Sequence, residues 1–147
     1  MKTTRLFLVA VLLLTSLFRA QADNDKPISF DKLPEASKTF IRKYFNEKDI
    51  SYAKVEDEIF SKSYDVFFVN GCKVEFDRKG EWESVDCFKE KIPSGIVPVE
   101  IVKYVEKNHP GFTIKKIDRD RRDYEIELNN DIEIKFDLKF NVIGYDD

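Results

Sequence analysis

The stretch that decides the fold is YDVFFVNGCKVEFDRKGEWESVDC, residues 64–87, because a similar string occurs again later in the chain. Residues 124–147 read YEIELNNDIEIKFDLKFNVIGYDD, and the two strings align without a gap. The matched positions are the alternating apolar residues and the residues expected in turns, such as Asn70 and Asn130. An internal match of this kind predicts a duplicated structural unit.

The turn chemistry of this stretch sets the strand register. If residues 69–71 form a three-residue loop with Gly71 in the left-handed conformation, Val66 pairs with Val74 and the apolar alternates share one face. A two-residue Asn-Gly turn would shift the register and mix the two faces, which is costly where one face is buried. The three-residue loop is therefore expected in both copies, with Asp131 in the left-handed position that Asp tolerates better than most residues.

Helical spacing precedes each copy. Apolar residues recur at three- and four-residue intervals from Leu33, and Pro34 suits a first helical turn, so the pattern predicts a helix over about residues 34–46. A second helix is predicted from Pro98 to the Asn-His-Pro-Gly sequence at 108–111. Each predicted unit is then one helix followed by four antiparallel strands.

A short strand is expected directly after each helix, at about residues 52–56 and 112–117. Val55 is interpreted as the counterpart of Ile117 in the second unit. On that alignment the spacing between the copies falls stepwise along the chain. Shorter connections in the second unit account for the change, because loops tolerate deletion better than the elements they join.

The first residues resemble a secretory leader. Lys2 and Arg5 precede an apolar run at residues 6–18 that is too short to span a bilayer comfortably, and residues 20–22 match a signal-peptidase site. Cleavage after Ala22 is expected, with an uncleaved membrane anchor as the alternative. The sequence therefore predicts a periplasmic or secreted protein whose mature chain does not insert into a membrane. The predicted segments are a signal peptide at 1–22, an extended lead-in at 23–32, a first repeat at 33–91 and a second repeat at 92–147.

The charge balance argues against a polyanionic partner. The whole chain has a formal net charge of −3, and losing the leader, with Lys2, Arg5 and Arg19, changes it to −6. A mildly acidic product lacks the broad basic footprint expected for binding nucleic acid or anionic lipid. Arg121 and Arg122 follow Arg119 in a small basic cluster, but Asp residues alternate with these arginines. That alternation indicates a solvated strand connection.

Both cysteines lie in the repeated stretch and would meet an oxidising compartment, where a pair is a disulfide candidate. A regular hairpin pairs Cys72 with Asp86 and leaves Cys87 facing the other way. Trp82 and Val85, however, are apolar at a spacing of three, which a plain strand cannot bury on one face. A β-bulge between them would bury both and bring Cys87 opposite Cys72. A Cys72–Cys87 disulfide is therefore predicted, with two free thiols as the alternative.

The face opposite the predicted core differs between the copies. The second copy presents an ordinary charged surface, whereas the first presents Asp65, Phe67, Lys73 and Glu75. Phe67 is apolar where its counterpart in the second copy is Glu127. This difference indicates a contact site around those four residues. The alternatives are that Phe67 is covered by a loop or by the other repeat, or is simply exposed.

Signals of catalysis or cofactor binding are weak. The single histidine, His109, lies at a helix end and is expected to cap or flank a turn rather than act as a base. Asp77 and Asp137 recur at equivalent positions, where side-chain turn formation explains them better than acid catalysis or calcium binding. Residues 129–131 lack the ligand count of a calcium loop. The sequence predicts no enzyme activity, no cofactor and no metal site.

The same motifs carry a family resemblance. They are Tyr64-x-Val66-x-Phe68-x-Asn70-Gly71, Val74-Glu75-Phe76-Asp77, Gly80-x-Trp82, Ile92-Pro93 and Val97-Pro98, followed by a degenerate second copy. Together they resemble the PepSY-like, beta-lactamase-inhibitor-like family of small exported bacterial proteins, over essentially the whole mature chain. The resemblance implies an α+β fold in which two tandem helix-plus-four-strand repeats form one curved antiparallel sheet, with the helices packed on one face.

Two functional hypotheses follow. The first is an exported, non-catalytic binding module, with inhibition as one form of that role, which engages an unknown protein or peptide of the envelope through the open sheet face. The alternative is a small-ligand or metal-sensing accessory module of an envelope signalling or protease system. The second copy departs from the family pattern at Asp131, Phe140 and Val142, which implies that the first copy carries more of any binding surface.

Overall fold

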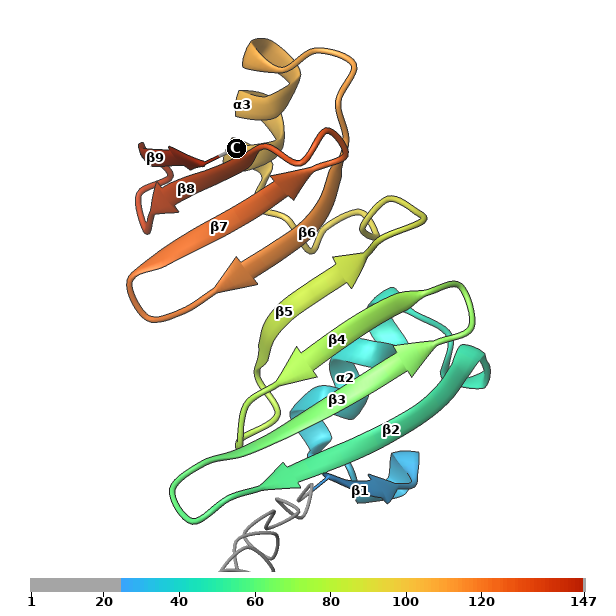
Figure 1. The fold of residues 1–147 in the computed structure, drawn as a ribbon. Coiled ribbons are helices and arrows are strands. Elements are labelled where there is room, and N and C mark those ends of the chain that lie inside the picture. The colour runs from blue at the N-terminus through green and yellow to red at the C-terminus, as the bar shows by residue number, and fades with distance from the viewer. Residues whose placement is uncertain (1–24, 147) are drawn as a thin grey trace, which may run out of the picture.

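The computed structural model describes residues 25–146, which form an α+β molecule with one open antiparallel sheet of nine strands and two α-helices (Figure 1). The strands lie in the sheet in chain order. The predicted signal peptide and its cleavage after Ala22 lie outside the described residues. The elements are β1 Asp25–Ile28, η1 Phe30–Lys32, α2 Glu35–Tyr44, η2 Glu47–Asp49, β2 Ile50–Asp57, β3 Lys62–Phe68, β4 Cys72–Phe76, β5 Trp82–Cys87, α3 Val99–Asn108, β6 Ile114–Arg119, β7 Asp123–Leu128, β8 Glu133–Asp137 and β9 Val142–Asp146.

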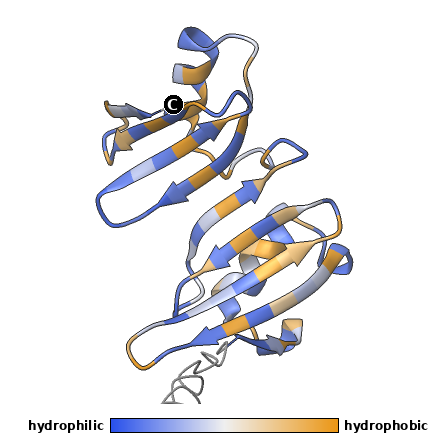
Figure 2. Ribbon diagram, viewed as in Figure 1, coloured by the Kyte–Doolittle hydropathy of each residue, from blue (hydrophilic) through white to orange (hydrophobic). Residues whose placement is uncertain are grey.

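Both helices pack on one face of the sheet. Each begins directly after a proline, Pro34 or Pro98, whose fixed φ suits a helix start. Ile41 of α2 and Ile101 of α3 are fully buried in a single cluster with the inward-facing strand residues. Hydrophobic and hydrophilic residues alternate along the strands, as Figure 2 shows, because successive side chains point to opposite faces. Within residues 25–146, no helix lies on the opposite face of the sheet.

The predicted hairpin register is confirmed in both halves. Val66 pairs with Val74 in the β3–β4 hairpin, and Ile126 pairs with Ile134 in the β7–β8 hairpin. The loop residues Gly71 and Asp131 both adopt the left-handed conformation, with φ of 89° and 67°. The three-residue loop therefore keeps the apolar residues of both strands on the core face.

The predicted counterpart of Ile117 is wrong. Ile117 pairs with Ile126 in the second half, whereas the equivalent residue of the first half, Val66, pairs with Ala53 and not with Val55. Ala53 is 3% exposed and faces the core, so it occupies the place assigned to Val55. The β2–β3 hairpin is consequently longer than its β6–β7 counterpart.

The lead-in predicted at residues 23–32 includes a ninth strand. Residues Asp25–Ile28 of β1 pair with β2, from Asp25 opposite Glu56 to Ile28 opposite Ala53. Sequence patterning missed this strand because it is short and contains Pro27, a residue that strands tolerate only at sheet edges. The strand forms one edge of the sheet.

Strands β5 and β6 join the two halves of the sheet. Their ladder contains three residue pairs, including Val85 opposite Ile117. Both side chains of that pair are fully buried, so the core continues across the junction. On the helix side, the hydroxyl of Tyr44 donates a hydrogen bond to the carbonyl of Gly95 at 3.3 Å. This contact ties α2 to the connection that leads into the second half.

The predicted bulge and disulfide are both present. The β4–β5 register shifts beside Phe76, which pairs with Trp82, while Val74 pairs with Val85. Cys87 then lies opposite Cys72, and the two form a disulfide with their Cα atoms 4.1 Å apart. One extra residue in β5 therefore buries both apolar side chains and aligns the cysteines.

We expect the Cys72→Ala/Cys87→Ala variant to unfold with a free energy about 3 kcal/mol lower than the wild type, because the bridge closes a loop with a sequence separation of 15. Urea denaturation of both proteins measures the difference. Reduced wild-type protein is the control and should match the variant. Finding two alkylatable thiols by intact mass, in protein purified from an oxidising compartment, would contradict the bridge.

Candidate binding face of the sheet

The open face of the first half brings together the four residues predicted to form a contact site. Asp65 and Phe67 lie on β3, directly opposite Glu75 and Lys73 of β4. All four point away from the helices, since they alternate with the buried residues Val66 and Val74. Whether this group binds a partner stays a prediction.

Asp65 is the centre of an ion-pair network on this face. Its side chain is 6% exposed, and its carboxylate lies 3.1 Å from Lys73 Nζ and 3.4 Å from Lys54 Nζ. Lys54 also contacts Asp25 at 2.6 Å and Glu56 at 2.7 Å. The hydrogen bonds that Lys54 donates to Asp25 and, secondly, to Glu56 raise the pKa of Lys54 well above its ordinary value. Strands β1 to β4 are therefore cross-linked by charges on their open face.

Lys73 keeps its charge despite partial burial. Burial lowers its pKa, but hydrogen bonds to Glu75 and Asp65 outweigh that effect, so the pKa of Lys73 is raised overall. The ammonium group also lies 5.3 Å from the centre of the Phe67 ring, a cation–π distance. Lys73 therefore connects the ion-pair network to the aromatic part of the face.

Phe67 is stacked on Tyr52, a residue that the sequence analysis did not assign to the site. The two rings are 4.3 Å apart and tilted by only 9°, and Tyr52 is 50% exposed. The cover on Phe67 therefore comes from the neighbouring strand, and not from a loop or the other half of the molecule. The missing signal was the strand register: with Ala53 opposite Val66, the next pair is Tyr52 opposite Phe67, and the register shifts only beyond it, between Tyr52 and Ile50.

The corresponding part of the second half is charged. Lys116 and Glu127 pair there, at the register position that Tyr52 and Phe67 occupy in the first half. Opposite charges raise the pKa of Lys116 against the effect of its burial, with Asp118 the nearest acid at 2.8 Å. The aromatic pair is thus a property of the first half alone.

The recurring aspartates act in turns, as predicted. Asp77 Oδ1 accepts hydrogen bonds from the backbone N–H groups of Lys79 and Glu81, and Asp137 does the same in the β8–β9 turn. His109 is the C-cap residue of α3, and its Nε2 lies 3.1 Å from the hydroxyl of Tyr145. Within residues 25–146, no group of three or more His, Cys, Asp or Glu side chains is placed to hold a metal ion.

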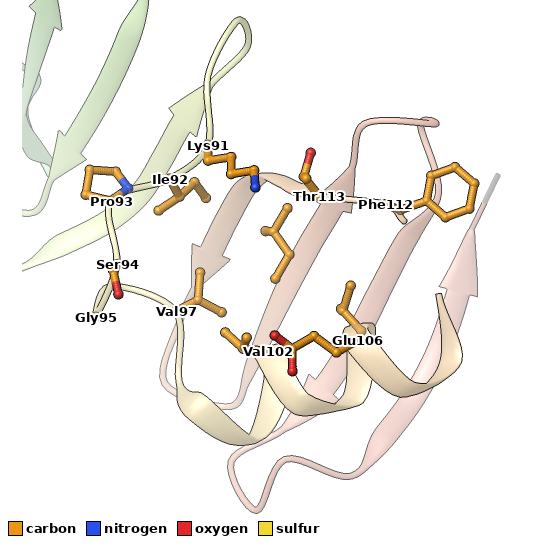
Figure 3. Close-up of a pocket in the computed structure, with 12 residues that line it drawn as sticks. Lys91, Ile92, Pro93, Ser94, Gly95, Val97, Val102, Glu106, Phe112 and Thr113 are labelled. Atoms are coloured by element: carbon orange, nitrogen blue, oxygen red, sulfur yellow. The ribbon is translucent and has the colours of Figure 1, made fainter. Parts of the chain in front are cut away.

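A pocket of about 270 Å³ lies on the helix side, between the β5–α3 connection, α3 and the start of β6. Lys91 reaches it from the connection and Glu106 from α3, on opposite sides, as Figure 3 shows. The lining between them is mainly apolar, with Ile92, Val97, Val102, Val105 and Ile114. The sequence analysis did not identify this pocket, because its walls come from separate segments.

The open antiparallel sheet with helices on one face defines the structural class of the protein. The chain belongs to the family described as "Putative beta-lactamase-inhibitor-like, PepSY-like", whose model matches residues 62–144. The resemblance stated from the sequence is therefore confirmed. No curated protein matches the chain.

Solved structures of similar proteins come from Bacteroides species. A "putative calcium-regulated periplasmic protein" from Bacteroides thetaiotaomicron is 48% identical, with a TM-score of 0.82, and the match covers 86% of this chain and 99% of that one. A "putative periplasmic protein" of the DUF2874 family from Bacteroides vulgatus is also 48% identical, with a TM-score of 0.80 and the same coverage. A third, from Bacteroides vulgatus and of unknown function, is 36% identical with a TM-score of 0.78, covering 84% and 99%.

These relatives are described as periplasmic, which confirms the predicted periplasmic or secreted location. Among the described residues, no helix is long and apolar enough to cross a bilayer.

We expect Lys73→Met to lower the free energy of unfolding by about 1 kcal/mol, because Asp65 loses its closer cation while the methionine keeps the apolar stem. Since the pKa of Lys73 is raised in the folded protein, this contribution is present below the ordinary lysine pKa of 10.5 and is lost as the pH rises above it. Urea denaturation at neutral pH and at a series of pH values above 10.5 measures both effects.

The matched control for this experiment is Lys135→Met, which removes a lysine of the same sheet face that contacts its acids at 3.5 and 3.8 Å. This variant should stay within about 0.5 kcal/mol of the wild type. An equal decrease in the free energy of unfolding of the two variants would show that the Asp65 network stabilises the fold no more than an ordinary surface ion pair.

Proposed function

We propose that this protein is an exported, non-catalytic binding module that holds a protein or peptide of the envelope on the open face of its first half. The contact site consists of Asp65, Phe67, Lys73 and Glu75, extended by Tyr52. Inhibition of the bound partner is one form that this role takes, in keeping with the description of the family.

The observation that carries the proposal is the Tyr52–Phe67 stack. Two large aromatic side chains stand on the face opposite α2 and α3, and Tyr52 is half exposed. Tyrosine and phenylalanine are enriched where proteins bind proteins, because they bury a large area and lose little conformational entropy. Lys73 and Asp65 hold the neighbouring strands together, so the aromatic surface is ordered before a partner arrives.

The charges around the stack suit a polypeptide partner. Asp65, Glu75 and Glu56 lie on the same face as Lys54 and Lys73, in alternating positions. A partner would meet apolar area flanked by donors and acceptors of both signs, as in the core and rim of a protein interface. His109 is held at the end of α3 beside Tyr145, and we assign it no catalytic role.

We also infer that the two halves derive from one duplicated unit, each a helix followed by four strands in a curved sheet. Three similarities support this. The left-handed loop residues recur as Gly71 and Asp131, the aspartate-capped turns recur after Phe76 and Phe136, and the hairpin registers are equivalent. The aromatic stack is then a feature that one copy has and the other lacks.

Replacing the stack, as Tyr52→Ala/Phe67→Ala, should reduce retention of the partner from envelope extract at least tenfold, because the contact loses its apolar centre. The immobilised protein is incubated with extract, and the retained proteins are quantified by mass spectrometry. The matched control is Lys116→Ala/Glu127→Ala, which changes the same register positions in the second half. Retention of every partner by the first variant would count against the proposal.

The pocket beside α3 favours a second candidate function, a small-ligand sensor. Its apolar lining would hold an aliphatic side chain, while Lys91 and Glu106 on opposite sides suit a carboxylate and an ammonium group. A short apolar peptide has this chemistry. Metal sensing belongs to the same alternative, because one relative is described as calcium-regulated.

On this second hypothesis, dileucine should raise the Tm of the wild type, since a ligand that binds only the folded state stabilises it. Val102→Trp should abolish the rise by filling the pocket. Val99→Trp, on the same helix but 56% exposed and outside the lining, should leave the rise intact. Calcium is tested in the same assay against magnesium. No shift with dileucine or calcium would eliminate the sensor hypothesis.

A further inference from the structure

The outer side of β9 is an unpaired strand edge. Strand β9 is the last in the sheet order, and within residues 25–146 no strand pairs with its outer side (Figure 1). Such an edge exposes backbone N–H and C=O groups, to which another chain can add a strand. The edge at the other end of the sheet is protected, because β1 carries Lys26 and Pro27, two residues that hinder such pairing. Strand β9 contains neither lysine nor proline.

The first half shows how a neighbouring strand fits such an edge. Strands β5 and β9 are equivalent, since each pairs with the second strand of its hairpin and each has a bulge at the same position. The other side of β5 pairs with β6, where Val85 lies opposite Ile117 and is fully buried. Tyr145 takes the place of Val85 in β9 and is 49% exposed. Within the described residues, the second half therefore lacks the strand that covers this position in the first half.

The backbone of Tyr145 points away from β8. The N–H of Leu128 donates to the carbonyl of Ile132 at 2.9 Å, so every second pair from there is hydrogen-bonded in the β7–β8 ladder, and Ile134 bonds to β7. Tyr145 lies opposite Ile134 and therefore directs its own N–H and C=O outward. The ring is turned towards α3, where its hydroxyl lies 3.1 Å from His109 Nε2.

Charges on the open face indicate which kind of segment fits this edge. One row of directly opposed residues crosses the open face and ends on β9; its members are Lys73, Asp86, Lys116, Glu127, Glu133 and Asp146. Opposite charges alternate along the row as far as Glu127, but its last three members are all acidic. Like charges directly opposite each other destabilise a sheet. A basic residue on an added strand would face Asp146 as Lys116 faces Asp86.

Lysines of this part of the sheet have other partners. Lys115 contacts Glu127 at 2.9 Å, and Lys135 contacts two acids of β7 at 3.5 and 3.8 Å. Among residues 25–146, neither Glu133 nor Asp146 forms an ion pair. The net negative charge of the mature chain also favours a basic segment over an acidic one.

We propose that the outer edge of β9 binds an extended basic segment of a polypeptide partner as a tenth, antiparallel strand. An apolar residue of that segment lies opposite Tyr145, in the place of Ile117, and the lysine or arginine before it lies opposite Asp146. Main-chain hydrogen bonds supply the affinity, and these two side chains supply the preference. This site goes beyond the proposed function of Tyr52 and Phe67, which lie on β2 and β3 at the other end of the strand order.

The test uses the mature chain, residues 23–147, and a blocked synthetic peptide with the sequence of residues 113–120, which includes β6. We expect amide chemical shifts of the labelled protein to change at residues 144–146. Hydrogen exchange of the Tyr145 N–H should slow about tenfold or more at saturation, because this group becomes hydrogen-bonded. A peptide N-methylated at the residue corresponding to Ile117 should not bind, since it keeps every side chain but loses the N–H that faces Tyr145.

Paired variants separate backbone pairing from side-chain contacts. Tyr145→Pro removes the outward N–H and should abolish binding, whereas Tyr145→Ala, which loses the same ring, should still bind. Asp146→Lys should weaken binding about fivefold, and the Lys116→Glu peptide should restore it in this variant. Tyr52→Ala/Phe67→Ala, at the other end of the sheet, should bind the peptide like the wild type.

Thermal melts identify any variant that fails to fold, and the N-methylated peptide tests the wild-type protein without a substitution. The proposal is overturned if the unmodified peptide does not bind, if N-methylation leaves binding unchanged, or if the shift changes lie away from β9. It is also overturned if the mature chain alone forms a dimer that Tyr145→Pro dissociates, because a second copy would then occupy the edge.

Discussion

The structure depends on one constraint: the sheet buries a single face, and the two-residue period of its strands sends every other side chain to the opposite face. Because both helices cover the same face, Val66 is sealed in the core while its neighbours Asp65 and Phe67 stand on the open side. A slip of one residue in this hairpin would exchange the two sets. The left-handed loop residue Gly71 therefore decides which side chains are buried and which reach the open face.

A comparison of the two halves shows which side chains the sheet needs in order to form and which it does not. Tyr52 and Phe67 occupy the register positions that Lys116 and Glu127 occupy in the second half, and the sheet forms equally well in both. An aromatic pair is therefore not needed to hold these strands together at that position. Cross-strand charges stabilise a sheet by amounts similar to cross-strand aromatics. The stack exposes apolar area that folding does not require, which is why it is the best marker of a contact site.

The features that could be predicted from the sequence follow local rules. Loop chemistry determined the hairpin register, and the spacing of Trp82 and Val85 determined the bulge and, with it, the disulfide. The features that were missed depend on pairing between distant segments. Ala53 is a weaker apolar signal than Val55, so its burial was overlooked, and with it the stacking of Tyr52. The pocket beside α3 arises only when separate segments meet.

Two turns at matching positions show how packing accounts for a difference in residue type between the two halves of the sheet. Gly80 has φ of 85°, and a Cβ there would lie 2.6 Å from Pro34 Cβ, so the approach of α2 requires glycine. Phe140 takes the same place in the second half with φ of 65°, and its ring packs 5.7 Å from that of Tyr124. A left-handed non-glycine residue costs about 1–2 kcal/mol, which burial of an aromatic side chain offsets. Here packing explains the difference completely. On the open face neither α2 nor α3 packs on the side chains, so a difference there is not explained by the core.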